Sequence, residues 1–476
     1  GWVAVGDPVL ILPPHEHEKI AAAQRELDFP GYVFGVDRNT PDVMVQLTER
    51  YASSLARHAD FRRLWTGDAL GQLGAELTGF AIPVFAVQTL HATEWEMGVL
   101  GAAEFAAFLA IGLPAGAWVD RMRKRHVLIV TDLVRAGVLA AVVVAALLGA
   151  ASVPLLVGAA LVIGVCRLFF DVAHQSYVPG LVGLEHVVEG NSKLQATASI
   201  AQATGPALGG VALRVITAPV LLAVTVVTYV LSATWVWRIR KPEPKPDPAS
   251  RRGLWVEVRE GLEFVLRERF LRRIVACTSI SNFAGNIGFA VFTIYVLRTL
   301  GLTEAVLGLI VSAGAVGGIL GALVAEPVTR FVGEGRIIPV TALLFAPAYA
   351  ALPLAGMLAA PPAVVLVAGM AVSTFIIVVY NIAQVSFRQR VCPPPLLGRM
   401  NASVRFIVWG VVPLGSLLGG WLGTQLGVVP TLWVAVGGSV LAALPVVLSP
   451  LVGMRDLPTP DHAAAEAVTE DETSAQ

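Results

Sequence analysis

Two carboxylates interrupt long apolar runs in the first quarter of the chain, and they are the groups best suited to carry a proton. Glu76 lies about 14 residues from the end of its run, or ~20 Å at the helical rise of ~1.5 Å per residue, and Glu104 lies ~10 Å deep in the next run. An ionised carboxylate is costly in an apolar medium, so it usually faces a cavity or a partner. We therefore predict proton coupling through Glu76 and Glu104. The alternatives are that Glu76 is permanently paired or neutral and that Glu104 reaches interfacial water.

A second group of charges surrounds the fourth apolar run. Arg167 and Asp171 are spaced i, i+4, which places them on one helical face. Asp171 is expected to pair with Arg167 or with Arg121. Asp132 and Arg135 are expected to join the same ionic cluster. The pattern favours a structural network over a direct role of the fourth-run charges in proton transfer, whereas His126 and His174 are expected to be isolated.

Neutral hydrogen-bonding side chains occur among apolar neighbours in the second half of the chain. Amides and a phenol in such a setting suit an amphiphilic ligand, or they link neighbouring helices. We predict a substrate cavity from Asn282, Asn286, Tyr295, Asn381 and Gln384.

The composition indicates what positions these groups. Hydrophobic residues make up 55% of the 476 residues, charged residues 14%, and the mean hydropathy is +0.71. A bilayer-spanning helix needs ~20 apolar residues. The sequence therefore predicts an all-α integral membrane protein with twelve transmembrane helices, over residues 64–90, 97–119, 127–149, 153–172, 194–216, 219–238, 273–299, 304–326, 337–358, 361–387, 403–426 and 428–449.

Cations are distributed unevenly between the two sides of these spans. The connection between the second and third spans, residues 120–126, is rich in Arg and Lys, whereas Arg214 and Arg298 are the cations predicted on the other side. Cytoplasmic loops carry the excess of Lys and Arg. The prediction is a multi-pass protein of the cell (inner, cytoplasmic) membrane with both termini in the cytoplasm.

This charged connection also suggests a gate between two halves of the molecule. Asp120 is predicted to contact cations across the interface, with Arg405 as its partner near the inner end of the eleventh span. The predicted cytoplasmic gate comprises Gly116, Asp120, Arg121, Lys124, Arg125, Asp132, Arg135, Asp171 and Arg405.

The chain repeats itself at a shift of 210 positions, which carries Gly205, Gly209 and Gly210 onto glycines 415, 419 and 420. Because each repeat holds six spans, the two halves should have parallel orientation. The predicted organisation is an unassigned polar segment (1–60), an N-terminal six-helix bundle (61–240), a cytoplasmic linker with an amphipathic helix (241–272), a C-terminal six-helix bundle (273–451) and a disordered tail (452–476).

Gly116-Ala-Trp-Val-Asp-Arg-Met-Arg-Lys-Arg125 resembles the G-x-L-a-D-r-x-G-r-k signature of the major facilitator superfamily. In that family the signature joins the second and third membrane helices on the cytoplasmic side. Trp118 replaces the usual Leu and Arg123 replaces the second Gly. The resemblance implies the fold of that superfamily, with two six-helix bundles related by a parallel repeat.

A further resemblance concerns the direction of transport. Residues 201–210 are similar to the g-x-x-x-G-P-x-x-G-G motif of export-type members, with Ala201 in place of the first Gly. Phe169–Pro179 and Gln389–Asn401 look like the group of the enterobactin exporter and macrolide efflux proteins. Membership would imply proton-driven export of a drug, macrolide or siderophore; an ordinary helix-packing face is the alternative for the motif. Its matching residues are Gly205, Pro206, Gly209 and Gly210.

The sequence favours no other class strongly. It has no phosphate-binding loop and no cluster with nucleophile or metal-ligand spacing, and its three cysteines suggest no disulfide framework. We therefore expect no enzyme activity, cofactor, metal or nucleic-acid partner. The expected partners are a small-molecule substrate, protons and the lipid bilayer, around a monomer. The alternative function is a membrane-anchored receptor or scaffold whose working part is the N-terminal segment.

Overall fold

The computed structural model describes residues 2–3, 10–11, 55, 58–183, 186–243, 254–393 and 396–455. Contacts divide the chain into Gly1–His58 and Ala59–Gln476. In the first unit, β1 (Trp2–Val3) and β2 (Leu10–Ile11) form a short antiparallel pair. Most of the predicted N-terminal segment, part of the linker, and the tail from residue 456 lie outside the described residues.

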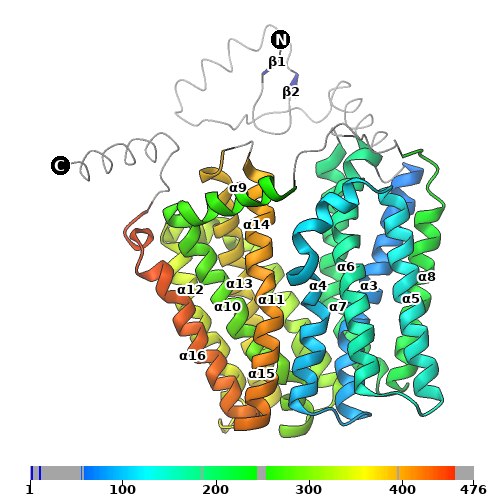
Figure 1. The fold of residues 1–476 in the computed structure, drawn as a ribbon. Helices are drawn as coiled ribbons and strands as arrows, with labels where there is room; N and C mark the ends of the chain where they lie inside the picture. The colour runs from blue at the N-terminus through cyan, green and yellow to red at the C-terminus, as the bar shows by residue number, and fades with distance from the viewer. Residues whose placement is uncertain are drawn as a thin grey trace, which may run out of the picture. The chain divides into compact units, whose positions relative to one another are not determined.

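The second unit is helical and consists of two consecutive sets of helices, which Figure 1 shows as two separate bundles. The first set is α3 (Ala59–Gln88), α4 (Glu94–Asp120), α5 (Lys124–Leu147), α6 (Val153–Val182), α7 (Val187–Ala212) and α8 (Ala218–Trp237). The second set is α10 (Arg269–Ile294) with the π-helical η4 (Tyr295–Thr299), α11 (Glu304–Val332), α12 (Ile337–Leu354), α13 (Pro362–Val391), α14 (Leu397–Gly410) with α15 (Val412–Leu426), and α16 (Val428–Val447). The short η6 (Pro450–Val452) ends the described chain.

Each bundle has six membrane helices when α14 and α15 are counted as one broken helix. Eleven helices of the described part are long and apolar enough to cross a membrane, and α7 is the member of the two bundles that does not meet that criterion. The first turns of α7 carry Glu189 and Lys193, which form an i, i+4 ion pair at 3.4 Å. These polar turns lower the hydropathy of α7, yet the helix packs against α3 and α11 within the assembly.

The amphipathic helix predicted between the bundles is present as α9 (Leu254–Arg267), which packs on α14. In Figure 1 it runs across the ends of the helices of the second bundle. Gly261 permits this approach, because a Cβ atom there would lie 2.5 Å from the carbonyl oxygen of Arg399. We refer to the end of the bundles that carries the turn at residues 121–123 as the basic end, and to the end that carries residues 89–93 as the opposite end.

The 210-residue repeat is visible in local structure. Thr93 caps α4 with a capping box completed by Glu96, and Thr303, at the equivalent position, caps α11 through its side chain. The helix contacts within the two bundles also correspond, since α3 packs on α8 as α10 packs on α16. The bundles meet through α4 with α15 and, at the repeat-related position, α7 with α11.

Glycines allow both of these contacts between the bundles. A Cβ atom added to Gly98 of α4 would lie 2.6 Å from the carbonyl oxygen of Ser416 in α15. The repeat-related Gly308 of α11 meets the carbonyl oxygen of Pro206 in α7 even more closely. Real Cβ atoms do not approach backbone oxygens so closely, so a larger residue would push the helices apart.

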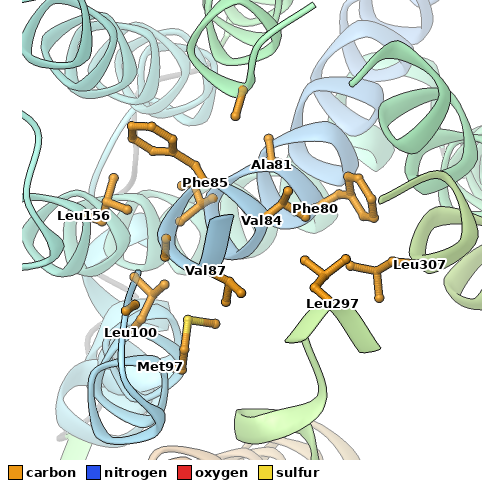
Figure 2. Close-up of a cluster of buried hydrophobic side chains, with 14 of the residues drawn as sticks. Phe80, Ala81, Val84, Phe85, Val87, Met97, Leu100, Leu156, Leu297 and Leu307 are labelled. Carbon is orange, nitrogen blue, oxygen red and sulfur yellow. The ribbon is translucent and has the colours of Figure 1, made fainter. Parts of the chain in front are cut away.

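An apolar cluster seals the bundles together at the opposite end. Phe80 and its neighbours on α3 pack toward Leu297 of η4 and Leu307 of α11, as Figure 2 shows. Arg298 adds polar contacts across the same interface, because its guanidinium donates to the carbonyl oxygens of Ala92 at 2.7 Å and Val87 at 2.6 Å. The two bundles are therefore closed against each other at this end.

Candidate functional site

Three adjoining cavities lie between the bundles and share the side chain of Phe289. The first, of ≈ 390 Å³, is lined largely by α3, α4 and α6 and includes Glu76, Glu104 and Arg167. The second, of ≈ 640 Å³, is lined mainly by α10, α13 and α14. A third of ≈ 290 Å³ joins Glu76 to residues of the second bundle. Each bundle therefore contributes a chemically different wall to one region.

Glu76 borders two of these cavities, and no other described residue forms a hydrogen bond or ion pair with it. Its position depends on α7, because a Cβ atom at Gly205 would lie 2.6 Å from the Cβ atom of Glu76. The glycine lets α7 pack directly over the residue that carries the carboxylate. The side chain is half-buried and borders the cavity.

Glu104 and Arg167 form an ion pair, with Oε1 and Nη1 3.2 Å apart. Gly164 allows α6 to touch the backbone of α4 at Glu104, which brings the two charges together. The Arg167 guanidinium also lies 5.8 Å from the ring centre of Phe105. The predicted pairing of Arg167 with Asp171 is therefore wrong, because the close contact of α4 and α6 directs Arg167 to a different helix.

Asp171 instead pairs with Arg405 of α14, at 3.6 Å between Oδ2 and Nη2. This contact joins the two bundles, and Arg405 also lies over the ring of Phe108 at 5.7 Å. Trp409, one turn further along α14, stacks on Phe105 with ring centres 5.9 Å apart. The sequence predicted that Asp171 would pair with Arg167 or with Arg121. Both predicted partners are wrong, because α6 and α14 face each other across the cavity and Arg405 takes that place.

Asp132 and Arg135 form a buried pair within the first bundle and do not join a wider ionic cluster at the bundle surface. Their side chains are 3.3 Å apart, and Asp132 also accepts a hydrogen bond of 2.7 Å from Ser232 of α8. Arg135 lies over the rings of Phe170 and Tyr229 at 5.0 and 5.5 Å. These contacts tie α5 to α6 and α8.

The sequence prediction missed an ionisable pair at Asp68 and His174. Asp68 is 2% exposed in α3, and its Oδ1 atom lies 3.3 Å from His174 Nε2 of α6. The expectation that His174 is isolated is therefore wrong. Helical spacing places His174 on the face of α6 that carries Asp171 and Arg167, but it does not identify Asp68 of α3 as its partner.

The charged turn at residues 121–123 contacts the first bundle. Backbone N–H groups of Lys124 and Arg125 donate to Glu243 at 2.7 and 3.1 Å, and the Arg125 side chain donates to the carbonyl oxygens of Val236 and Trp237. No close neighbour surrounds the Cα atom of Gly116, and Arg121 is exposed. The side chain of Asp120 lies outside the described residues, so its predicted contact with Arg405 stays a prediction.

Four of the five residues predicted to form a substrate cavity line the second cavity together: Asn282, Asn286, Asn381 and Gln384. Tyr295 lies apart, because it is fully buried and its hydroxyl accepts a hydrogen bond of 3.2 Å from Gly356 N. It holds η4 to the end of α12 and does not border this cavity.

The remaining members of the export-type motif pack α7 against both bundles. A Cβ atom at Gly209 would lie 2.9 Å from the Phe80 ring, and one at Gly210 would lie 2.5 Å from the carbonyl oxygen of Glu304. Directly after Pro206, the backbone N–H of Ala207 donates to Ser312 Oγ of α11 at 3.0 Å. The motif thus combines helix packing with the placement of Glu76.

The described residues contain no group of three or more His, Cys, Asp or Glu side chains arranged to hold a metal ion.

Comparison with known proteins agrees with this architecture. A family model described as Major Facilitator Superfamily matches residues 64–413. No curated protein sequence matches the chain.

Solved structures with similar folds include transporters. The nucleoside transporter NupG superimposes with a TM-score of 0.64 at 12% identity, covering 82% of this chain and 98% of that chain. A bacterial homologue of the iron transporter ferroportin in its inward-facing state gives 0.65 at 16% identity, covering 83% and 99%. The outward-facing state of a bacterial ferroportin homologue gives 0.54 at 14% identity, covering 82% and 98%. At these identities the likeness concerns the fold.

Proposed function

We propose that this chain, which belongs to the major facilitator superfamily, exports a small amphiphilic molecule from the cell in exchange for protons. The chain is a multi-pass membrane transporter of the major facilitator type. The observation that carries the finer proposal is Glu76, a carboxylate without a partner among the described residues, at the meeting point of the cavities between the bundles.

Proton exchange at Glu76 follows from its surroundings. Glu104, the neighbouring carboxylate of the cavity, pairs with Arg167 at 3.2 Å, whereas Glu76 has no ion-pair partner among the described residues. Glu76 takes up a proton when the cavity faces the outside and releases it when the cavity faces the cytoplasm. Substrate moves in the opposite direction, from the cytoplasm to the outside, so that the entry of each proton drives export.

Orientation rests on the charge distribution. The basic end carries Arg121, Arg123, Lys124 and Arg125, and cytoplasmic loops hold the excess of cations. We therefore place the basic end in the cytoplasm and the opposite end outside. In that orientation the described conformer is closed to the outside, consistent with its higher TM-score to the inward-facing ferroportin homologue than to the outward-facing one.

Alternating access requires contacts that one state makes and the other breaks. At the opposite end the closing contacts are the glycine-mediated helix crossings and the hydrogen bonds of Arg298. Closer to the basic end, Asp171 and Arg405 join the bundles through a partly exposed ion pair. Strengthening the second set while breaking the first would turn the cavity toward the outside.

The walls of the cavities favour an amphiphilic substrate. The first cavity presents several aromatic rings, including Phe105, Phe170 and Phe292, whereas the second presents amides. A molecule with an apolar ring system and a polar edge would contact both. The likeness of residues 169–179 and 389–401 to the enterobactin exporter and macrolide efflux group supports export of such a compound.

The test uses purified protein in vesicles with an imposed pH gradient. Anionic, neutral and cationic dansyl derivatives serve as fluorescent amphiphiles, and trapped pyranine reports proton movement. Wild-type protein should accumulate at least one probe against its gradient and release protons in step. Glu76→Gln should lose this accumulation while probe exchange without a gradient survives.

A matched control is Glu326→Gln, because Glu326 is an exposed carboxylate paired only with Arg330 on its own helix among the described residues. It should transport like the wild type. Full proton-coupled accumulation by Glu76→Gln would refute Glu76 as the carrier. The proton site would then be sought at Glu104 first and at Asp132 or Asp171 next.

A further inference from the structure

The second cavity carries a positive charge that no residue of its own wall offsets. Arg388 of α13 and Arg405 of α14 both line it, and none of the described residues that line it carries a carboxylate. The remaining polar lining consists of amides and hydroxyls. Isolated charges in a membrane protein are costly, and they usually mark a place where a partner binds.

Arg388 is the stronger sign of a missing partner. Its Nε atom is buried and has no hydrogen-bond acceptor in the described structure. The Nε atom of Arg135 is buried without an acceptor as well, but its Nη1 atom pairs with Asp132, whereas Arg388 has no ion-pair partner among the described residues. A buried donor without an acceptor destabilises the structure. An acceptor that enters the cavity would recover that free energy.

Other donors of the cavity wall are also available. Asn282 and Asn286 use their side-chain amides to hold backbone carbonyls, at 3.0 Å to Val408 and 2.8 Å to Asn282. Asn381 accepts a hydrogen bond of 3.4 Å from Gln384, which leaves the amide hydrogens of Asn381 available. The guanidiniums of Arg388 and Arg405 and the amide of Asn381 can therefore donate into a single cavity.

We propose that the second cavity binds an oxyanion carried by the substrate, a carboxylate in the simplest case. This inference rests on the proposed transport of amphiphiles and narrows their class to aromatic or apolar molecules with an anionic end. Arg388 and Arg405 donate to the anion, since guanidinium groups suit carboxylate geometry. Phe105, Phe289 and Trp409, which border the same cavity, contact the apolar part.

Arg405 also connects substrate binding to the contact between the bundles. It pairs with Asp171 at 3.6 Å, and that carboxylate borders the first cavity and not the second. A substrate anion in the second cavity competes with Asp171 for the same guanidinium. Binding therefore breaks the ion pair that joins α6 to α14.

The experiment measures binding to the purified full-length protein in detergent by fluorescence titration. The probes are dansylglycine, which carries a carboxylate, its neutral amide dansylglycinamide, and the cation dansylcadaverine. Wild-type protein should bind dansylglycine at least tenfold more tightly than the amide, as expected for hydrogen bonds to a charged group. Equal affinity for the three probes, or preference for the cation, would overturn the proposal.

Three variants locate the site. Arg388→Gln should weaken dansylglycine about tenfold and leave the amide unchanged, whereas an equal loss for both probes would show a merely structural role and refute the assignment. Arg390→Gln is the control, because Arg390 lies on the same helix but is exposed and pairs with Glu334. Asp171→Asn should tighten dansylglycine severalfold by freeing Arg405. A damaged protein cannot imitate that gain, and unchanged affinity in Asp171→Asn would refute the competition.

Binding in detergent needs no pH gradient, so the two proposals can fail separately. Selective dansylglycine binding without gradient-driven transport in vesicles would retain the anion site and refute proton-coupled export. Gradient-driven transport of the neutral or cationic probe, with no preference for dansylglycine, would retain export and refute the anion site.

Discussion

Replacement of Arg298 by Ala should open the bundles at the opposite end. The Arg298 guanidinium donates to the carbonyl oxygens of Val87 and Ala92, at 2.6 and 2.7 Å, and both acceptors belong to the other bundle. Val87 lies in the last turn of α3, where carbonyl groups lack helical partners and attract cations. Arg298→Ala removes both hydrogen bonds and the charge, and leaves the surrounding apolar cluster in place.

The size of the effect can be worked out from these two bonds. A hydrogen bond to a charged group contributes about 1.5–3 kcal/mol. Because Arg298 is exposed and one side chain makes both bonds, we expect about 2–3 kcal/mol for the two together. Each ~1.4 kcal/mol changes an equilibrium tenfold. The ratio of closed to open molecules at this end should therefore fall by roughly 30- to 150-fold.

Distance measurements between two spin labels can detect this shift. Leu147 and Met357 occupy equivalent positions in the repeat at the opposite end, and both are largely exposed, at 74% and 67%. Cysteines at these positions would be labelled in a protein whose three buried native cysteines are replaced. Wild-type protein should give one main distance, and Arg298→Ala should add a longer one.

The control is Arg214→Ala, which removes an exposed cation near the same end. It should leave the distance distribution unchanged. If Arg298→Ala also gives the wild-type distribution, the two hydrogen bonds do not stabilise the closed state and the reasoning fails. A longer distance in both variants would point to a general effect of surface charge.

Three further predictions concern topology, gating and packing. Single cysteines at Ala151 and Pro361 should react with an impermeant reagent from outside the cell, and one at position 247 only from inside; the reverse pattern would refute the orientation. Asp120→Asn should slow efflux of the dansyl probes without reducing membrane insertion, and normal turnover would count against a gate there. Gly308→Val should separate α7 from α11 at a cost of about 1–3 kcal/mol, which the same spin labels would report as a longer distance.

The fold could be predicted from the sequence because its signals are local or periodic. Long apolar runs mark the spans, and the shift by 210 positions identifies two parallel halves. The same shift relates Thr93 to Thr303 as helix caps and Gly98 to Gly308 as contact residues between the bundles. One helix, α7, is too polar in its first turns for hydropathy alone, and its place in the repeat identifies it.

The charged partners could not be predicted in the same way. Sequence spacing relates residues on one helix, as for Arg167 and Asp171, but the actual pairs join different helices. Arg167 reaches Glu104 because a glycine brings α6 onto α4, and Asp171 reaches Arg405 because the second bundle lies opposite. Such pairing depends on how each helix is rotated about its axis and on which helices, far apart in the sequence, pack together. The periodicity of the sequence specifies neither.

The contacts between the bundles at the opposite end are stronger than those closer to the basic end. This difference suits a transporter whose conformation responds to bound substrate. At the opposite end, close glycine-mediated packing and the two hydrogen bonds of Arg298 hold the bundles together. The pair of Asp171 and Arg405 is 35% and 38% exposed, and such partly exposed ion pairs contribute only about 0–1 kcal/mol. A substrate anion that binds Arg405 needs to overcome little to release this contact. Separation of the bundles near the bound molecule would therefore require less free energy than separation at the opposite end. A change at Glu76, which lies beside the packed glycines of α7, is better placed to act on the contacts at the opposite end.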